Sequence, residues 1–487
     1  MGFAFERIYV RRKMLKKLKL YISDETKAAL AYLIASVVSK GLVVLTIPIY
    51  TRLMSTEQIG IVNIFTSWYA ILGGVFSLGL TSGGLMLGLN NYKDKQEEYL
   101  STIMFLTTLG GGVFGVLLVC FTKLICDITK LPLSLTILMF FAFVFCPATD
   151  FWIAKQKYNN KYKLSSLILI LSSFCSLGVA IIAVKKVAIY PEIKQSEAWL
   201  YGTYIIMIVF SMVIWLTIMC KGRRVINISY WKYSLTLSIP LIGQMIAAQI
   251  LSFSDRIMIE RFCGESKVGI YSTIYVVGTA STMVWGAING AFTPYIYKNI
   301  ENNKAGIKES SIKIIVSLSV ISFLIVLVGP EITKIIGTSE YYEGMAIIPF
   351  VSAGVYLIAI GDIYSDFLIY LKKTYFIMIG TMIGAVINVI LNYIFIPIYG
   401  YTVAAKTTLI AYLCMVVFFI VICNVLSFRE SFELNKIADQ KIIIFISVFT
   451  IVLDLLLITL YDKIVIRFVL LLCLIVFVFC RVLKKPV

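Results

Sequence analysis

Long stretches without a single charged residue recur from one end of the chain to the other, and they restrict its fold more than any other feature. An α-helix rises about 1.5 Å per residue, so about 20 apolar residues cross the roughly 30 Å hydrocarbon core of a bilayer. Each stretch is therefore expected to form one transmembrane helix. The ten stretches are 58–92, 99–122, 131–149, 164–184, 198–220, 233–254, 268–297, 314–330, 344–361 and 407–428.

The remaining predicted spans are not charge-free stretches of the usual length. Residues 374–405 are too many for one span, and the segment "IPIYGY", with Pro397 and Gly400, marks a turn within them. Hydrophobic residues make up 60% of the chain and charged residues only 14%, which is outside the range of soluble domains. The sequence predicts an all-α integral membrane protein with about 14 transmembrane helices. Three of these helices tolerate one or two charges, namely 28–51, 442–461 and 464–480.

Lysine and arginine indicate the orientation of the chain, because they concentrate in cytoplasmic connections. With an even number of spans both termini lie on one side, whose connections carry 30 of these residues against 13 on the other side. We therefore expect both termini in the cytoplasm. This topology also explains the net charge of +18, so no nucleic-acid partner is expected. The segment "RRKMLKKLKL" at 11–20 either lies on anionic headgroups as an amphipathic helix or only sets the topology.

Residue types that usually carry catalysis or hold metals are scarce. The chain has no histidine, and its ten cysteines include no C-x-x-C pair. A zinc site or an activated Cys or Ser nucleophile is therefore not expected. The external connections, with at most about fifteen residues, are too short to shape an enzyme site. The sequence predicts no cofactor, no metal and no catalytic residues.

One short segment occurs twice. The segment "TRLMSTEQIGIVNIF" at 51–65 aligns without a gap with "ERFCGESKVGIYSTI" at 260–274, and Gly60 matches Gly269. Six predicted spans separate the copies, so both face the same side of the membrane. Such a parallel repeat predicts two six-helix lobes that rock around a central cavity, as in many transporters. The glycines would let the second helix of each lobe pack closely.

The repeat also divides the chain into parts. At the start of the second span, Ser55 and Gln58 have the spacing of a capping box. The expected parts are a basic cytoplasmic segment at 1–27, an N-lobe of spans 1–6 at 28–220, a cytoplasmic linker at 221–233, a C-lobe of spans 7–12 at 234–425, and two additional spans with a basic tail at 426–487.

Three segments resemble those of one transporter family. They are "SKGLVVLTIPIYTRLMSTEQIGIVNIF" (39–65), "SFSDRIMIERFCGESKVGIYS" (252–272) and "IGAVINVILNYIFIPIYGYTVAAKTTLIAYL" (383–413). Over about residues 28 to 425 the chain is similar to the polysaccharide transporters of the multidrug/oligosaccharidyl-lipid/polysaccharide superfamily. These are the flippases for lipid-linked O-antigen and capsule repeat units.

This resemblance implies a substrate and a mechanism. The substrate would be an undecaprenyl-pyrophosphate-linked oligosaccharide, moved by alternating access from the cytoplasmic to the outer leaflet of the bacterial inner membrane. H⁺ or Na⁺ would drive the cycle, and membrane lipids, a polysaccharide polymerase and the chain-length machinery would be partners. One departure is that such flippases often carry a cavity-facing arginine in the eighth span, whereas residues 268–297 hold no charge. A cationic site must therefore be built elsewhere.

Cations inside or beside the spans are candidates for binding the pyrophosphate. Lys40 lies about 12 residues from either end of its span, roughly 18 Å from each interface, so it should face the bundle interior with a partner. Alternatively, Lys40 and an aspartate form a buried pair that only holds helices together. Arg52 and Arg261 would either be anchors at the membrane interface or contact the substrate. The full set of cationic candidates is Lys40, Lys406, Arg52, Arg256 and Arg261.

Carboxylates would take up and release the coupling ion. Asp362 and Asp366 are four residues apart, so they share a helix face. Asp255 and Arg256 would form either a gate contact between the lobes or a solvated cluster at the rim. The candidates for ion coupling or gating are Asp150, Asp255, Asp362 and Asp366. Asp454 and Arg467, in the additional helices, are expected to serve packing or an interface there and to lie outside the transport pathway.

Two other functions remain open. A cation-coupled multidrug exporter of the same superfamily would share the fold and differ in its cavity. The short external loops and the missing histidine count against a membrane polysaccharide polymerase or ligase. A cavity open sideways to lipid, between spans one and eight, would distinguish a flippase from an exporter, because a polyprenyl tail must stay in the bilayer while its headgroup crosses.

Overall fold

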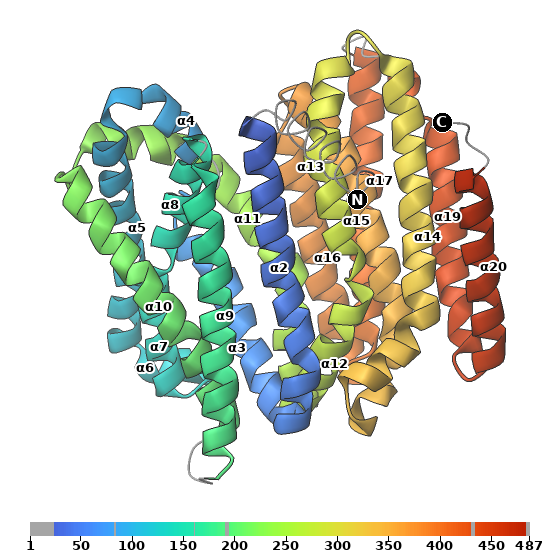
Figure 1. Ribbon diagram of the computed structural model, residues 1–487, viewed down its shortest axis with the longest axis horizontal. Coiled ribbons are helices and arrows are strands. Elements are labelled where there is room, and N and C mark those ends of the chain that lie inside the picture. Colours follow the sequence, from blue (N-terminus) through green and yellow to red (C-terminus); the bar gives the residue numbers. More distant parts are fainter. Residues whose placement is uncertain (1–23, 82–83, 160, 190–193, 430–433, 484–487) are drawn as a thin grey trace, which may run out of the picture.

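A computed structural model describes residues 24–81, 84–159, 161–189, 194–429 and 434–483, and these residues form helices with no strand among them (Figure 1). The predicted all-α class is confirmed. The first half contains α2 (Asp24–Leu53), α3 (Thr56–Phe76), α4 (Leu85–Asn91), η1 (Lys93–Lys95), α5 (Gln96–Cys120), α6 (Thr122–Thr129), α7 (Leu133–Phe145), α8 (Pro147–Tyr158), α9 (Tyr162–Val187) and α10 (Gln195–Gly222). The second half contains α11 (Ile228–Cys263), α12 (Glu265–Gly278), α13 (Ser281–Asn299), α14 (Lys304–Ile336), η2 (Ser339–Ile347), α15 (Ile348–Tyr370), α16 (Tyr375–Tyr399), α17 (Val403–Arg429), α18 (Leu434–Ile437), α19 (Gln440–Leu456), η3 (Leu457–Leu460) and α20 (Ile464–Leu483).

Many of these helices can cross a bilayer. Within the described residues, ten helical segments are long and apolar enough to do so, and α11 is an eleventh if its two parts, bent by 49°, count as one span. The other predicted spans fall on α2, on α12 with α13, and on α20. The integral membrane class is therefore confirmed, and the count of fourteen stays a prediction.

The helices form two lobes that lie side by side (Figure 1). The N-lobe holds α3 to α10, and α2 lies along its inner side against α9. The C-lobe holds α12 to α17, and α19 and α20 form a separate pair packed against α14. α11 contacts both lobes, because it packs on α3 of the first and on α16 of the second.

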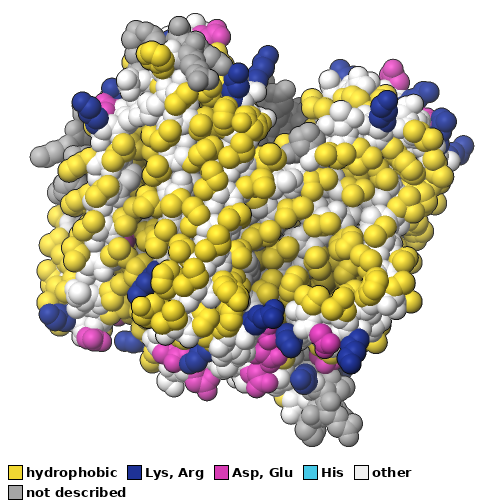
Figure 2. Space-filling model, turned by 180° about the vertical axis from the view of Figure 1, so that it is seen from behind, with side chains coloured by type: hydrophobic (Ala, Val, Ile, Leu, Met, Phe, Trp, Pro, Cys, Tyr) yellow, Lys and Arg dark blue, Asp and Glu magenta, His cyan; other side chains and the backbone are white. Residues whose placement is uncertain are grey.

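The surface of the molecule fits a bilayer. A broad band of hydrophobic side chains covers the middle, and charged side chains gather at the two rims (Figure 2). Among the exposed apolar side chains are Leu45, Phe428 and Val465. Apolar patches of this extent are not stable in water, so the band marks the part of the surface that lipid chains cover.

The two copies of the repeated segment pack against each other at the lower end of Figure 1, where α2 ends and α3 begins. A Cβ atom on Gly60 would lie 1.9 Å from the carbonyl oxygen of Glu265, and one on Gly269 would lie 2.0 Å from that of Thr56. Each glycine thus packs against the first residue of the helix that begins in the other copy, Glu265 of α12 or Thr56 of α3. The hydroxyls of Thr56 and Ser266 are 2.8 Å apart and hydrogen-bonded. The expectation that these glycines permit close packing is confirmed, and the packing joins the lobes.

The predicted capping box of α3 is only half formed. The Ser55 side chain caps the helix by accepting a hydrogen bond from the backbone N–H of Gln58 (3.3 Å). The second hydrogen bond of a capping box, from the backbone N–H of Ser55 to the Gln58 side chain, is not formed. Instead, Gln58 Oε1 accepts from the backbone N–H of Ser196 (2.9 Å). That N–H is one of the free donors at the start of α10, so Gln58 links two helices of the N-lobe.

The hydrophobic cores show where the lobes meet. One cluster takes buried side chains from both lobes, including Phe65 of α3 and Ile274 of α12. At the upper end, where α10 ends and α11 begins, the N-lobe has its own cluster around Tyr99. Another cluster, around Tyr364, belongs to the C-lobe. In the described part of the chain, therefore, the lobes share a core at the lower end and have separate cores elsewhere.

Candidate functional site

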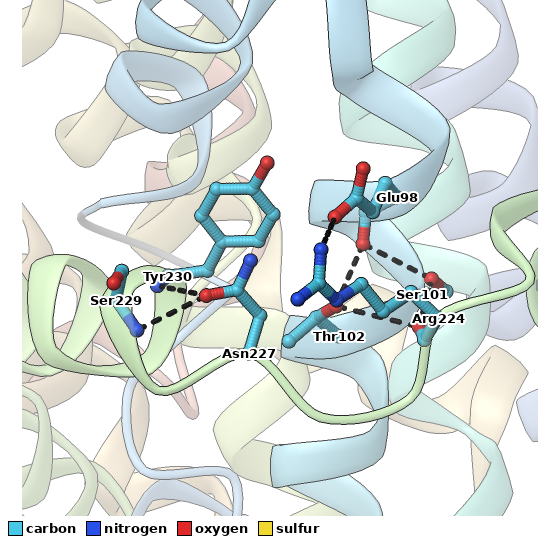
Figure 3. Close-up of polar contacts among 7 residues, drawn as sticks. All are labelled: Glu98, Ser101, Thr102, Arg224, Asn227, Ser229 and Tyr230. Atoms are coloured by element: carbon cyan, nitrogen blue, oxygen red, sulfur yellow. Dashed lines mark hydrogen bonds and ion pairs between the residues drawn. The ribbon is translucent and has the colours of Figure 1, made fainter.

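The linker between the lobes is fastened to the N-lobe (Figure 3). The Arg224 guanidinium donates to Glu98 Oε1 (2.8 Å), and the Arg224 carbonyl accepts from the Ser101 hydroxyl (2.7 Å). The Asn227 side chain then accepts hydrogen bonds from the first turn of α11 and caps that helix. α11 therefore starts on the N-lobe and carries its later residues into the C-lobe.

Asp255 lies in this later part of α11 and is fully buried. Its Oδ2 accepts hydrogen bonds from the hydroxyls of Tyr271 in α12 (2.7 Å) and Thr408 in α17 (3.3 Å). Its Oδ1 is also buried and has no hydrogen-bond partner among the described residues. A buried carboxylate oxygen without a partner is costly, so this position is suited to receive a proton or a cation.

The neighbouring Arg256 is buried as well, but it faces aromatic rings. Its guanidinium lies 4.4 Å from the centre of the Tyr275 ring and 5.4 Å from that of Phe253, and it donates to the carbonyl of Ser252. Such cation–π contacts stabilise an arginine away from water. The alternative of a solvated cluster at Asp255 and Arg256 is wrong, because both side chains are buried, with exposed fractions of 0% and 8%.

A network of polar side chains extends from Asp255 into the C-lobe. Asn388 Nδ2 donates to the Thr408 hydroxyl (2.9 Å), and Asn388 Oδ1 accepts from Ser254 (3.1 Å) and from Asn392 (3.1 Å). Thr407 donates to Asn392 Oδ1. None of the residues of this network apart from Asp255 was predicted from the sequence, although the sequence holds a signal for it. Asn388 and Asn392 are four residues apart in an otherwise apolar span, and polar side chains in a span face the interior.

The chemistry of this network restricts the ion it can bind. Carboxylate, hydroxyl and amide oxygens are the ligands that hard cations prefer. Among the described residues, no group of three or more His, Cys, Asp or Glu side chains could hold a metal ion. Asp255 is the one carboxylate named in the network, and the buried guanidinium of the next residue, Arg256, already acts on it electrostatically. The network therefore lacks the negative charge that a divalent ion would need, and what its free carboxylate oxygen can accept is a proton or a singly charged cation.

Asp362 and Asp366 point from α15 toward α13. Trp285 Nε1 donates to Asp362 Oδ2 (2.7 Å), Thr293 donates to Asp366 Oδ2 (2.8 Å), and the Tyr297 hydroxyl donates to Asp366 Oδ1 (3.3 Å). These three donors lie in the part of α13 that belongs to the eighth predicted span, 268–297, which carries no charge. In place of a cation it supplies three uncharged hydrogen-bond donors to the two carboxylates. The structure thus brings these two predicted residues together on one helix face.

Asp150 is placed elsewhere. It is exposed and lines a cavity of about 240 Å³ together with Tyr69 of α3 and Gln249 of α11. The cavity lies between the N-lobe and α11, so motion of α11 would change its shape. The role of Asp150 in ion coupling or gating stays a prediction.

The predicted cations do not converge on one site. Arg52 is exposed and donates to the carbonyl of Ile335 (3.0 Å), so it links the lower ends of α2 and α14. Lys406 is exposed with its Nζ 5.4 Å from the centre of the Phe350 ring, and Arg261 is exposed at the end of α11. The roles of Arg52, Arg261 and Lys406 at the substrate stay predictions.

Lys40 belongs to α2, but its side chain lies outside the described residues. Its predicted contact with the substrate therefore stays a prediction. Of the four predicted cations whose side chains the structure describes, Arg256 is the buried one.

Buried polar contacts attach the C-terminal helices to the C-lobe. Arg467 of α20 makes a two-pronged ion pair with Glu331 of α14, at 2.5 and 2.6 Å, and also donates to the Leu327 carbonyl (2.8 Å). Asp454 of α19 accepts a hydrogen bond from Ser322 of α14 (2.5 Å). As expected from the sequence, Asp454 and Arg467 take part in packing.

Comparisons with known proteins agree with this architecture. Among solved structures, a lipid II flippase, MurJ, in an inward closed conformation is 16% identical with a TM-score of 0.67, and the match covers 94% of this chain and 99% of that chain. An inward-facing and an outward-facing structure of multidrug resistance MATE family transporters of the MOP superfamily are 14% and 16% identical, with TM-scores of 0.58 and 0.55. They cover 79% and 82% of this chain, and 93% and 95% of their own chains are covered. These likenesses show the fold.

Sequence comparison adds the family. No curated protein sequence matches the chain significantly. A family profile described as "Polysaccharide biosynthesis protein" matches residues 26–300, which is more than half of the chain. The expected two-lobed transporter fold and this match agree, and the chain belongs to the polysaccharide biosynthesis protein family.

Proposed function

We propose that the protein is a flippase that moves an undecaprenyl-pyrophosphate-linked oligosaccharide from the cytoplasmic to the outer leaflet of the bacterial inner membrane. The observation that carries this proposal is the extent of the structural match within a polysaccharide biosynthesis family. The lipid II flippase covers 94% of the chain, whereas the two multidrug transporters cover 79% and 82%. An architecture that extends over nearly the whole chain supports a lipid-linked substrate over a drug.

The packing of the lobes supports alternating access. The lobes share a core at the lower end and have separate cores toward the upper end. The bias of Lys and Arg predicts that the upper end, where α20 ends in Figure 1, is cytoplasmic. In this state the protein would therefore accept its substrate from the cytoplasmic leaflet.

Ion coupling is assigned to Asp255 in this proposal. A proton or Na⁺ bound at the free Oδ1 would remove the cost of the unpaired oxygen and hold Tyr271 and Thr408 around the carboxylate. Tyr271 is two residues from Gly269, which packs on α3 of the N-lobe. Binding of the ion would thus act directly on the helix that closes the lower end.

Arg256 and Lys40 are proposed to attract the pyrophosphate. A guanidinium presents paired donors that match phosphate oxygens, and a lysine supplies a compact charge. Arg256 would leave the Tyr275 ring when the lobes separate and meet the anionic headgroup. No step of this cycle breaks a covalent bond. A polysaccharide polymerase and the chain-length machinery would then use the lipid-linked oligosaccharide in the outer leaflet.

Deleting the gene in its host tests the proposal. Lipid-linked oligosaccharide should accumulate in the cytoplasmic leaflet and surface polysaccharide should be lost, and the wild-type gene should restore both. Sensitivity to toxic cationic drugs, measured in the same strains, should not change. Greater drug sensitivity with normal surface polysaccharide would reject the flippase and favour the multidrug exporter.

A further inference from the structure

A polar cavity opens at the upper end of the N-lobe, next to the linker between the lobes. Its volume is about 640 Å³, which lies within the roughly 300–1,000 Å³ of small-molecule sites. It shares no lining residue with the cavity beside Asp150. Its walls come from η1, the start of α5, the ends of α8 and α10, and the residue before α9. The proposed transport cycle uses none of these residues.

Contacts between helices hold these walls in place. Lys155 of α8 forms an ion pair with Glu97 in the first turn of α5. Asn159, directly after α8, donates through its Nδ2 to Gln96 Oε1 (3.2 Å). Gly222, at the end of α10, packs on the same turn of α5, because a Cβ atom built there would lie 2.5 Å from the Glu97 carbonyl oxygen. The cavity is thus formed before anything binds in it.

Positive charge predominates in the lining. Five lysines and three carboxyl groups line the cavity, which gives the lining a net charge of +2. Glu97 is paired with Lys155, and Glu98 is paired with Arg224 of the linker. An anion in the cavity would be attracted by the remaining ammonium groups together. The four remaining lysines are exposed and form no ion pair with another described residue; they are Lys93, Lys95, Lys161 and Lys221.

The distribution of these lysines points to a ligand rather than to topology alone. Membrane orientation requires Lys and Arg in the connections on one side, but it does not require lysines from three connections to line one cavity. Lysine binds phosphate oxygens as a compact charge with three donors. A phosphate monoester carries a charge of about −1.5 to −2 at pH 7. This charge balances that of the lining.

We propose that this cavity binds a phosphate or diphosphate group, which comes either from a soluble compound or from the headgroup of an anionic lipid. Lys95 of η1 and Lys221 of α10 hold it from two walls of the cavity. Glu98 lines the same cavity and accepts the hydrogen bond of Arg224 that fastens the linker (Figure 3). A phosphate held by Lys221 restrains the residues that follow, so it stiffens the start of the linker. Binding of the phosphate does not rest on the proposed flippase function.

Binding of inorganic pyrophosphate to the purified full-length protein in phosphatidylcholine nanodiscs tests for a soluble ligand. Isothermal titration calorimetry should show one saturable site. The Lys95→Gln/Lys221→Gln protein should bind roughly tenfold more weakly or worse, because each change removes a hydrogen bond to a charged group. The matched control, Lys298→Gln/Lys372→Gln, removes two exposed lysines from the connections of the C-lobe on the same predicted side. It should keep the affinity of the parent protein.

A lipid headgroup is tested with phosphatidylglycerol in the nanodiscs. Native mass spectrometry counts the phosphatidylglycerol molecules that stay bound after release, and the parent and the control should retain one more than the Lys95→Gln/Lys221→Gln protein. Hydrogen exchange of the backbone amides at 223–227 should slow when either probe binds. Binding of neither probe, or equal binding of both by the parent and the Lys95→Gln/Lys221→Gln protein, would mean that these lysines only set the topology and would overturn the proposal. Unchanged exchange with a probe bound would overturn the effect on the linker.

Discussion

At the scale of single residues, the proposed mechanism depends on Asp255 Oδ1, which has no hydrogen-bond partner within the described part of the chain. Asp255→Asn keeps the size of the side chain and lets an oxygen accept from Tyr271, but it removes the negative charge that a proton or Na⁺ would balance. We expect near-normal amounts of protein in the membrane and a transport rate reduced by roughly tenfold or more, which corresponds to about 1.4 kcal/mol. The rate should no longer depend on the ion gradient. Transport into vesicles with and without imposed H⁺ or Na⁺ gradients measures this.

The control for this prediction is Asp127→Asn, which removes an exposed carboxylate from α6 and should change neither quantity. An Asp255→Asn protein that still responds to the gradient would remove Asp255 from ion coupling. In that case Asp362 and Asp366, which Trp285, Thr293 and Tyr297 hold by hydrogen bonds, would be the next residues to examine.

At the scale of elements, the contact between α3 and α12 depends on the absence of two side chains. Gly60→Val would place a Cβ atom 1.9 Å from the Glu265 carbonyl, so the helices must move apart. Overpacking of this kind costs about 1–3 kcal/mol. Disulfide formation between Thr56→Cys and Ser266→Cys, whose native hydroxyls are 2.8 Å apart, measures the contact in a background without the native cysteines. The yield should fall clearly in the Gly60→Val protein.

Gly112→Val is the matched control, because no atom lies within 4 Å of a Cβ built at Gly112 in α5. It should leave the disulfide yield unchanged. Equal yields in Gly60→Val and the parent would mean that the repeated glycines do not set the distance between the lobes.

Elements of this protein were easier to predict than its contacts. A bilayer leaves a single chain few options other than helices, so length and lack of charge were enough to predict α3 or α17. The partners of Asp255 were not predictable in this way, because Tyr271 lies 16 positions away and Thr408 lies 153 positions away. Spans face lipid on one side and protein on the other, and both surroundings are apolar. Hydrophobic periodicity therefore does not show which face is buried.

At the scale of the whole molecule, the lobes share a core at one end, and α11 connects them. The fastening of Arg224 to Glu98 holds the start of α11 on the N-lobe, whereas Asp255 lies in the C-lobe on the same helix. A change at Asp255 can therefore be transmitted along α11 as well as through α12. Under the proposed function, an ion bound at Asp255 would thus be connected through two helices to the relative position of the lobes.

Flipping by the purified protein tests the central claim most directly. The protein is reconstituted into vesicles with a fluorescent undecaprenyl-pyrophosphate-linked oligosaccharide, and a membrane-impermeant quencher reports which leaflet holds the headgroup. The account predicts that the headgroup crosses faster than in protein-free vesicles, that an ion gradient raises the rate, and that Asp255→Asn abolishes this increase. Crossing no faster than in protein-free vesicles, while the same vesicles move a cationic drug, would contradict it.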